Sequence, residues 1–365
     1  MKMNSLRNRG FSLVELMIAM GIGLFLVGAA ISVYFAQTQT YKTTNSQASI
    51  QNAENAISAL VTPLIREAGF AGCGSLKNST PNLKSGLPPP LGSLSPSSGS
   101  NAFVFGYEAT ATSPLNTPNA LTLPSDNYAN DATLSDWSPA LDASLASMVE
   151  KGSDVLVLLG GVPNTDPISV TSNVPGAANL DVQTVAALAK NQLVAVSNCV
   201  GTSVFKITSI TGTTLNHIAG ASAGDNIGAA LAIDFQPGAQ VMPLQQTAFF
   251  VAQGAGDQAT LMMAVYSAGS WAVQPLVPGV EAFQVLYGTG AAGAITEYVS
   301  ADKVANWDNV YALRLGFLLQ GQTGSATYST TAQSTFTLLG TPITVPADGR
   351  LRHVFEMTIQ LRNAS

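Results

Sequence analysis

An uncharged apolar run near the N-terminus constrains this chain more than any other feature. Residues 16–36 contain no charged side chain, and the first one after Glu15 is Lys42. Such a run is long enough to cross a hydrocarbon layer roughly 30 Å thick as a helix. The first ten residues of the chain carry three basic side chains and no acid, and basic flanks stay on the cytoplasmic side. We therefore expect a single-pass membrane protein whose remaining chain lies outside the cytoplasm.

Glu15 is the anomaly in this segment. A carboxylate near the membrane core costs about 3 kcal/mol or more, so it usually has a partner. Cleavage after Gly10 would make Phe11 a new N-terminus, and the α-amino group of a neighbouring subunit could then neutralise Glu15 in a membrane or fibre core. The alternatives are a plain signal anchor and an ordinary secretory signal cut near Ala29 and Ala30. Neither accounts for Glu15.

The composition permits a sizeable core and does not indicate a polyanion partner. The chain has 365 residues, of which 46% are hydrophobic and 10% charged. Without the first ten residues it carries twelve basic and 21 acidic side chains, so we expect no nucleic-acid binding. Arg350, Arg352 and Arg362 are expected to lie on a solvated strand face.

The two cysteines, Cys73 and Cys199, are expected to form a disulfide. An even number of cysteines in an oxidising compartment favours a bridge over free thiols. By the loop-closure model this bridge would destabilise the unfolded chain by about 4–5 kcal/mol. It would tie the end of the first helix to the sheet. Two buried, unpaired thiols are the alternative.

The first helix is predicted to continue well past the membrane, to about Glu67, with a potential kink at Pro63. At about 1.5 Å per residue it would be roughly 85 Å long. Gly21, Gly23 and Gly28 in its membrane half favour close packing with another helix. The later half has an apolar stripe at helical spacing, formed by Ala48, Ile50, Ala53, Ala56, Ile57, Leu60, Val61 and Leu64.

The rest of the chain is predicted to be β-rich and antiparallel, because short strands are separated by Gly, Asn and Pro. Residues 75–139, rich in Pro, Ser and Gly, are expected to form a long surface excursion with at most short strands, such as 102–107. The last strand alternates cleanly, with Leu351 to Leu361 on one face. The predicted strands are 154–159, 192–197, 203–210, 247–253, 260–266, 281–287, 310–320 and 350–361.

The segment Arg9-Gly10-Phe11-Ser12-Leu13-Val14-Glu15 resembles the type III signal of type IV prepilins. The resemblance implies that prepilin peptidase cuts after Gly10 and that Phe11 is methylated, while Glu15 guides subunit docking. It also implies a pilin-like α+β fold, in which a long helix packs on an antiparallel sheet domain. The expected organisation is a leader at 1–10, a membrane or fibre-core helix at 11–36, an amphipathic half at 37–72 and a globular domain at 73–365.

The body of the chain resembles the PilW-type minor pilins. The resemblance implies a structural subunit that helps to initiate pilus assembly in a tip or priming complex. Its expected partners are the other minor pilins, the major pilin, the inner membrane and, as a further candidate, a tip adhesin. Its expected location is the inner membrane and then the pilus at the cell surface. The matching segments are Arg66–Cys73, Gly152–Leu156, Ser197–Cys199 with Val204-Phe205, Leu276–Glu281 through Tyr287-Gly288, Trp307–Val310, and Arg350–Arg352 to Leu361–Asn363.

Two other functions are compatible with a prepilin-like signal. A J-type minor pseudopilin of type II secretion is the first, although the chain length and the excursion at 75–139 favour the pilus system. An adhesive role for the excursion is the second. PilW-like proteins often have an acidic, calcium-loop-like turn after the Tyr-Gly pair. Here that turn, residues 288–293, has no carboxylate, so no metal is expected.

Enzymatic patterns are present but weak, and we expect no catalytic activity and no cofactor. Residues 288–293 and 254–259 match glycine-rich nucleotide patterns, which need a strand followed by a helix. Residues 220–224 match the G-x-S-x-G elbow of serine hydrolases around Ser222, with Asp302 and His353 following in hydrolase order. A secreted hydrolase is therefore the remote alternative. His217 has no nearby cysteine or second histidine to form a metal site.

Overall fold

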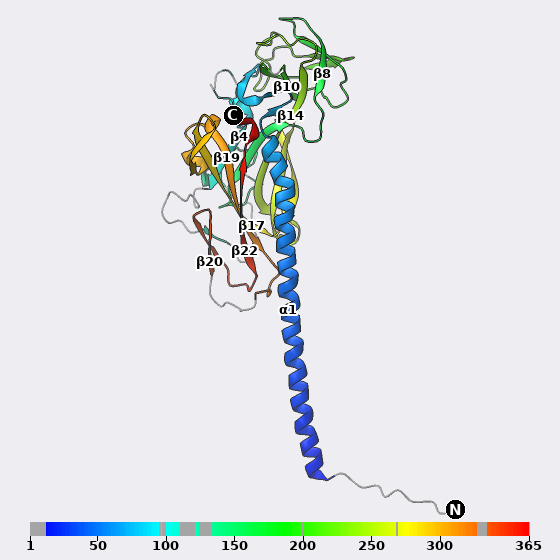
Figure 1. The fold of residues 1–365 in the computed structure, drawn as a ribbon, viewed down its shortest axis with the longest axis vertical. Helices are drawn as coiled ribbons and strands as arrows, with labels where there is room; N and C mark the ends of the chain where they lie inside the picture. Colours follow the sequence, from blue (N-terminus) through cyan, green and yellow to red (C-terminus); the bar gives the residue numbers. More distant parts are fainter. Residues whose placement is uncertain are drawn as a thin grey trace, which may run out of the picture.

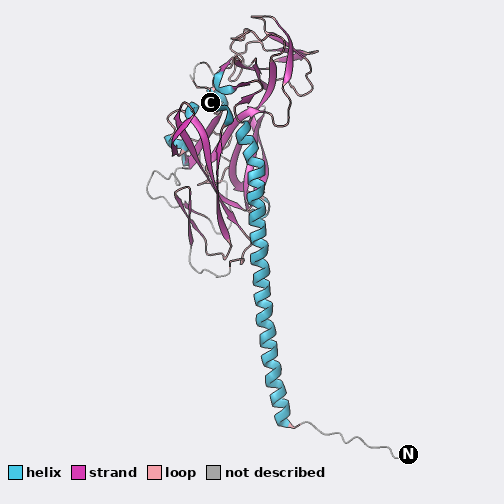
Figure 2. Cartoon of the chain, viewed as in Figure 1, coloured by secondary structure: helices cyan, strands magenta, loops and turns pink. Residues whose placement is uncertain are grey.

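A single helix and a large β-domain make up this protein (Figure 1, Figure 2). The computed structural model describes residues 12–94, 96, 100–109, 121–123, 133–145, 147–198, 200–267, 269–326 and 334–364. Helix α1, Leu13–Glu67, has 55 residues and is therefore roughly 80 Å long. Its N-terminal half projects from the domain, and its C-terminal half lies along it (Figure 1). This is the predicted pilin-like α+β arrangement.

The end of α1 is set by a change of backbone conformation and by a close approach to Phe103. Ala68 leaves helical geometry, and Gly69 adopts a positive φ of 78°, which glycine tolerates without strain. A Cβ atom at Gly69 would lie 2.9 Å from the Phe103 ring. The helix continues through Pro63 and ends at Glu67, as predicted.

One stripe of α1 is buried against the domain, as the spacing predicted. Its members are separated by four or seven residues, which places them on one face. Ile57 is fully buried, whereas Leu60 is 44% exposed and Ala48 is exposed, so the predicted stripe was too wide. The buried helix residues are Ser46, Ile50, Ile57, Val61 and Ile65.

Most strands belong to a 13-stranded sheet that runs from the middle of the domain to its distal end. Apart from a parallel pair between β11 and β3, its ladders are antiparallel. The strands are β3 Ser79–Pro81, β4 Val104–Ala109, β6 Trp137–Ser138, β7 Val155–Gly161, β8 Ile168–Asn173, β9 Asn179–Val182, β10 Leu193–Ser197, β11 Thr202–Lys206, β12 Ser209–Thr211, β13 Thr214–Asn216, β14 Gln240–Gln253, β15 Ala259–Ser267 and β16 Ser270–Pro278.

Strand β14 joins two parts of this sheet. Its first residues pair with β10 and β8 in the distal lobe. From Leu244 onward it pairs with β7, and from Gln246 with β15, in the part next to α1. Because a single strand of 14 residues crosses both parts, the two share one hydrogen-bonded framework.

Three smaller sheets complete the domain. A four-stranded antiparallel sheet has the order β18-β17-β19-β22, and its strands are β17 Val280–Ala291, β18 Ala294–Val299, β19 Val310–Gln320 and β22 Arg352–Gln360. A three-stranded sheet contains β5 Leu121–Thr122, β20 Ser334–Leu338 and β21 Thr341–Val345. Strands β1 Phe70–Ala71 and β2 Gly74–Ser75 form a short hairpin after α1.

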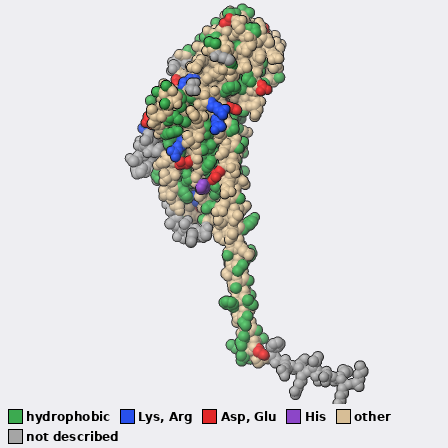
Figure 3. Space-filling model, in the orientation of Figure 1, with side chains coloured by type: hydrophobic (Ala, Val, Ile, Leu, Met, Phe, Trp, Pro, Cys, Tyr) green, Lys and Arg blue, Asp and Glu red, His purple; other side chains and the backbone are tan. Residues whose placement is uncertain are grey.

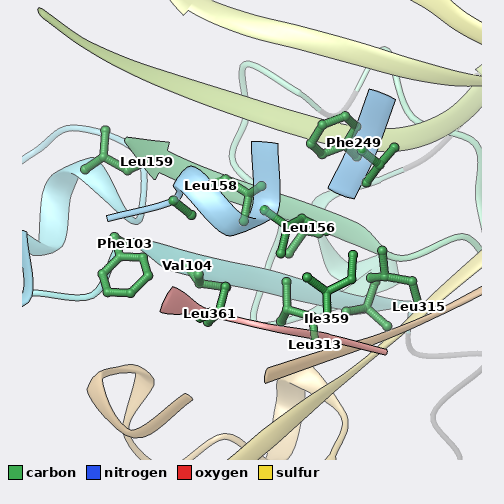
Figure 4. Packing of buried hydrophobic residues seen from close by; sticks show 14 of the residues in the cluster. Phe103, Val104, Leu156, Leu158, Leu159, Phe249, Leu313, Leu315, Ile359 and Leu361 are labelled. Carbon is green, nitrogen blue, oxygen red and sulfur yellow. The ribbon is translucent and has the colours of Figure 1, made fainter. Parts of the chain in front are cut away.

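The main core lies between the helix stripe, the β7 region and the four-stranded sheet. The predicted alternation in β22 is confirmed, since Phe355, Met357 and Ile359 all pack against this core. Helix α1 contacts β22, β19, β16 and β7. The residues that meet there include Val104, Leu156, Leu158, Phe249, Leu313, Leu315, Ile359 and Leu361 (Figure 4).

The described part of the expected excursion at 75–139 forms short strands, among them β4 near the suggested strand 102–107, and it is more buried than a surface loop. It supplies β3, β4 and β6 to the large sheet and β5 to the three-stranded sheet. It also buries Leu76, Phe103 and Trp137. The Pro- and Ser-rich composition concealed these short segments, because each contributes only a few apolar residues to cores built elsewhere. Of the other predicted strands, 310–320 matches β19 at both ends, 203–210 is divided into β11 and β12, and the rest are present with shifted ends.

Truncating the buried helix stripe should destabilise the domain far more than truncating its exposed flank. Ile57→Ala leaves a cavity and should lower the free energy of unfolding by about 2–4 kcal/mol. Leu60→Ala, one turn away and half exposed, should change it by less than about 1 kcal/mol. Thermal unfolding of the detergent-solubilised full chain measures both. Equal destabilisation by the two variants would contradict the observed orientation of α1.

Candidate functional site: the N-terminal helix and the junction that holds it

Glu15 lies in the first turn of α1, where it caps the helix. The Ser12 backbone N–H donates to Glu15 Oε2 at 2.9 Å, and the Glu15 N–H donates to Ser12 Oγ at 3.2 Å. This reciprocal pair is a capping box, which satisfies two otherwise unpaired helix donors. Gly10 and Phe11 lie outside the described residues, so cleavage and methylation there stay predictions.

The apolar run of α1, up to Ala36, is exposed and makes no hydrogen bond to another element of the described chain, and the Phe25 side chain is 76% exposed. The first hydrogen bonds to the β-domain come from Gln39 and Thr43, which donate to backbone carbonyls of residues 324–326. Nothing lies within 4 Å of a Cβ built at Gly21, Gly23 or Gly28. This is the one helix, among the described residues, long and apolar enough to span a membrane. Figure 3 shows its apolar side chains along the projecting stalk.

The C-terminal segment closes on the end of α1. Asn363 Nδ2 donates to the Ala68 carbonyl at 2.9 Å, and Ser75 Oγ donates to the Asn363 carbonyl at 2.8 Å. The Gly69 N–H donates to the Leu159 carbonyl of β7 at 2.8 Å. The helix end, the large sheet and the chain's last residues are therefore tied at one point.

A disulfide reinforces the same junction. Cys73 is disulfide-bonded, and it lies in the β1–β2 turn. The Gly74 N–H donates to Ser197 Oγ at 3.1 Å, and Ser197 Oγ donates to the Ala71 carbonyl at 2.8 Å. Ser197 ends β10. Cys199 lies outside the described residues, so its pairing with Cys73 stays a prediction, supported by these contacts between the flanking segments.

Arg352 contradicts the prediction of a solvated arginine face. Its guanidinium donates two hydrogen bonds to Glu281, at 2.6 and 2.9 Å, and two more to Asp348, both at 2.8 Å. The Arg352 and Glu281 side chains are only 3% and 2% exposed. A buried pair of this kind needs good geometry to offset desolvation, and the bidentate arrangement provides it. The pair fixes the start of β22 against β17.

Asp154 links the large sheet to the four-stranded sheet. Its Oδ1 accepts from the Ala109 N–H of β4 at 3.0 Å, and its Oδ2 accepts from the Val285 N–H of β17 at 2.8 Å. Burial raises the pKa of Asp154 to about 7, although these two amide donors oppose the shift, and the charge of Asp302 raises it further.

Glu108 lies beside Asp154 and is 1% exposed. A backbone hydrogen bond from Ala301 favours its charged form but is outweighed by burial. Burial, and then the charges of Asp154 and Asp302, raise the pKa of Glu108 to about 10. The side chain is therefore protonated at neutral pH, because an ionised carboxylate would be too costly there.

Trp307 and Asp308 close the other side of this region. The Trp307 ring packs on Tyr287 at 4.8 Å and on Phe105 at 4.6 Å between ring centroids. Asp308 Oδ1 accepts from Ser100 Oγ at 3.1 Å and from the Asn101 N–H at 3.0 Å. These contacts hold the segment that precedes β4 against the four-stranded sheet.

The glycine-rich nucleotide patterns both form hairpin connections. Residues 288–293 include the β17–β18 turn, in which Ala292 and Gly293 have φ values of 51° and 82°. Residues 254–259 connect β14 to its antiparallel neighbour β15. Neither pattern precedes the α-helix that a pyrophosphate site requires.

The three residues of the hydrolase pattern have separate partners. The Ser222 N–H donates to Asp225 at 2.9 Å, Asp302 accepts from Ser300, and His353 Nε2 lies 3.3 Å from Glu54 of α1. No hydrogen bond or ion pair of the described residues joins any two of the three. The pattern therefore builds no triad in this structure.

His217 is a core histidine. It is fully buried, it lies 4.8 Å from the Phe205 ring, and burial lowers its pKa to about 4. The described part of the chain contains no cluster of three metal-ligating side chains.

Two protein families match this chain, one at the N-terminal signal and one over its C-terminal third. Residues 5–31 match the family described as prokaryotic N-terminal methylation motif, and residues 248–363 match type IV pilus-assembly protein W. A solved type IV-like pilin from Thermus thermophilus is 20% identical over 48% of this chain and 86% of its own, with a TM-score of 0.22. No curated protein sequence matches.

This protein is pilin-like and of the type IV class. It has the methylation motif, and its long helix projects with one half from the β-domain and packs against that domain with the other half. Within that class, residues 248–363, from strand β14 to Asn363, are similar to the family of type IV pilus-assembly protein W. The N-methylation motif implies processing by prepilin peptidase.

Replacing Glu108 by a side chain that cannot ionise should remove part of the pH dependence of stability. The folded pKa of about 10 lies above the usual value of 4.5, so between these values the folded state holds a proton that the unfolded state releases. Stability therefore falls as pH rises, by at most about 1.4 kcal/mol per pH unit for one proton. Glu108→Gln should unfold at a higher temperature than wild type at pH 9 and nearly the same at pH 5.

Thermal unfolding of the full chain at pH 5, 7 and 9 measures this effect. Glu297→Gln, on the exposed strand β18, is the matched control and should leave the wild-type profile unchanged. A Glu108→Gln protein that is less stable than wild type at pH 9 would contradict the assigned protonation state.

Proposed function

We propose that this protein is a minor pilin that helps to initiate type IV pilus assembly as part of a tip or priming complex. The observation that carries the proposal is the apolar run of α1, up to Ala36, whose side chains are exposed and make no hydrogen bond to another element of the described chain. Lipid can cover this surface in the inner membrane, and helices of other subunits can cover it in a fibre. The β-domain holds only the second half of the helix.

Glu15 is proposed to be the assembly contact. It sits at the membrane end of α1 and already accepts one hydrogen bond, from the Ser12 N–H. A carboxylate has room for several more donors, so capping its own helix leaves capacity for a neighbour's α-amino group. Such a contact inside an apolar environment would be strong, because the local dielectric constant is low.

The remaining roles follow from the same arrangement. Prepilin peptidase would cut between Gly10 and Phe11, and the chain would stay anchored by its helix with the β-domain in the periplasm. The major pilin, other minor pilins and a tip adhesin are the proposed neighbours. Cys73, paired with Cys199, would hold the β-domain to the helix end after export.

A J-type minor pseudopilin of type II secretion is the second candidate, because the helix and its processing signal would serve that machine equally. A deletion strain distinguishes the two. Loss of surface pili with normal exoprotein secretion supports the pilus function, and the reverse result supports the pseudopilin.

Processing is the first test of the proposal. Intact-mass and N-terminal analysis of the membrane fraction should find a chain that begins at N-methylated Phe11 in cells with prepilin peptidase. Cells without the peptidase should retain the full leader. A mature chain that begins after Ala30, or one that keeps Met1 in both strains, would remove the pilin proposal.

Replacing Glu15 tests the assembly contact separately from processing. Glu15→Ala should still be cut and methylated at Phe11, because the scissile bond remains, but surface pili should fall several-fold. Glu297→Ala, on the exposed strand β18, is the matched control for loss of an acidic side chain. Pilus numbers come from electron microscopy, and normal piliation of Glu15→Ala cells would refute the role.

A further inference from the structure

Arg66 and Arg362 flank one small pocket where α1 ends. Arg66 belongs to the last turn of the helix, and Arg362 begins the short helix η7, Arg362–Ala364. The pocket has a volume of about 370 Å³, and Gly293, Tyr311, Gln360 and Leu361 complete its lining. Figure 3 shows basic side chains gathered on this face, over the upper end of α1.

Neither arginine has a carboxylate partner within the described chain. The other three described arginines, at positions 314, 350 and 352, all pair with carboxylates. Both pocket arginines are exposed, so their guanidinium groups are available to a ligand. The protein has more acidic than basic residues, yet these two arginines at one pocket have no carboxylate partner. They are therefore candidates to bind an anion from another molecule.

The floor of the pocket is firm and carries further positive charge. Tyr311 is 5% exposed, and the Lys77 ammonium lies 4.7 Å from its ring centroid while donating to the Ala364 carbonyl. Arg362 follows Leu361, whose N–H donates to the Tyr311 carbonyl at 2.8 Å, and precedes Asn363, which bonds to Ala68. The two arginines thus come from segments that the junction holds together.

We propose that this pocket binds a carboxylate side chain of a neighbouring protein chain, and this inference rests on the proposed function as a pilus subunit. Guanidinium groups bind carboxylates through paired N–H donors. The pocket, at about 370 Å³, has room for a carboxylate side chain. The acidic balance of the chain disfavours a long polyanion, which would meet repulsion beyond the pocket.

The position of the pocket also disfavours a lipid headgroup. Arg66 lies about thirty residues beyond the end of the apolar run, which corresponds to roughly 45 Å along the helix axis. A headgroup at the membrane that anchors α1 is therefore out of reach. A second subunit standing beside this one can present an acidic side chain at that height.

Carbodiimide cross-linking in intact cells tests the occupant. The reagent joins a carboxylate to an amine, so Arg66→Lys and Arg362→Lys place a reactive amine in the pocket while keeping its charge. We expect each lysine variant to form an amide with an Asp or Glu of another protein chain, identified by peptide mass spectrometry. Arg66→Gln and Arg362→Gln should form no such product, and Lys190, exposed in the distal lobe, should cross-link several-fold less.

The other outcomes overturn the proposal in distinguishable ways. Products no more abundant than those of Lys190, or only cross-links within the same chain, would exclude a neighbouring carboxylate. Reaction of the lysine variants that rises after nuclease treatment would assign a nucleic-acid phosphate instead. N-terminal analysis of the same sample separates the two hypotheses. A mature Phe11 end without cross-links overturns this site alone, and an unprocessed chain overturns the proposed function.

Discussion

Burial of one apolar stripe of α1 is the interaction on which the rest of the structure depends. The stripe meets strands that are far apart in sequence, from β7 near the middle of the chain to β22 near its end. Each sheet has an apolar face that water would otherwise contact, and the helix supplies part of the cover for both. Because Ile57, Val61 and Ile65 are nearly or fully buried, the helix cannot leave without exposing the core between the sheets.

The polar contacts around this core connect segments that the sequence separates widely. Glu281 reaches Arg352, Asn363 reaches the helix end at Ala68, and Asp154 bridges β4 and β17. All of these residues belong to the segments that carry the resemblance to PilW-type pilins. Their shared property is structural, because they fasten the helix end and the two sheets to one another. A structural reason therefore accounts for these segments without a catalytic role.

The helix, the membrane run and most strands could be predicted from the sequence because each has a strong local signal. The last strand alternates cleanly, and the helix stripe repeats at three or four residues. The side-chain partners of individual residues within the chain could not be predicted in the same way. Arg352 looked solvated because its buried partner Glu281 lies 71 residues away. The segments within 75–139 looked like loop because their burial depends on surfaces made by β7, β14 and β21. Glu108 had no sequence signal, since its burial arises only where β4, β7 and β17 meet.

The parallel course of α1 along the domain has a mechanical consequence. Tension applied to the projecting half of the helix acts along its axis, so it loads the buried stripe in shear. Separation in shear must break the contacts from Ser46 to Ile65 together, whereas peeling would break them one turn at a time. The tie between Asn363 and Ala68 and the disulfide at Cys73 lie at the far end of the stripe from the pull. They are therefore the last side-chain connections to bear the load, and they hold the end of the helix against the sheets if the stripe slips.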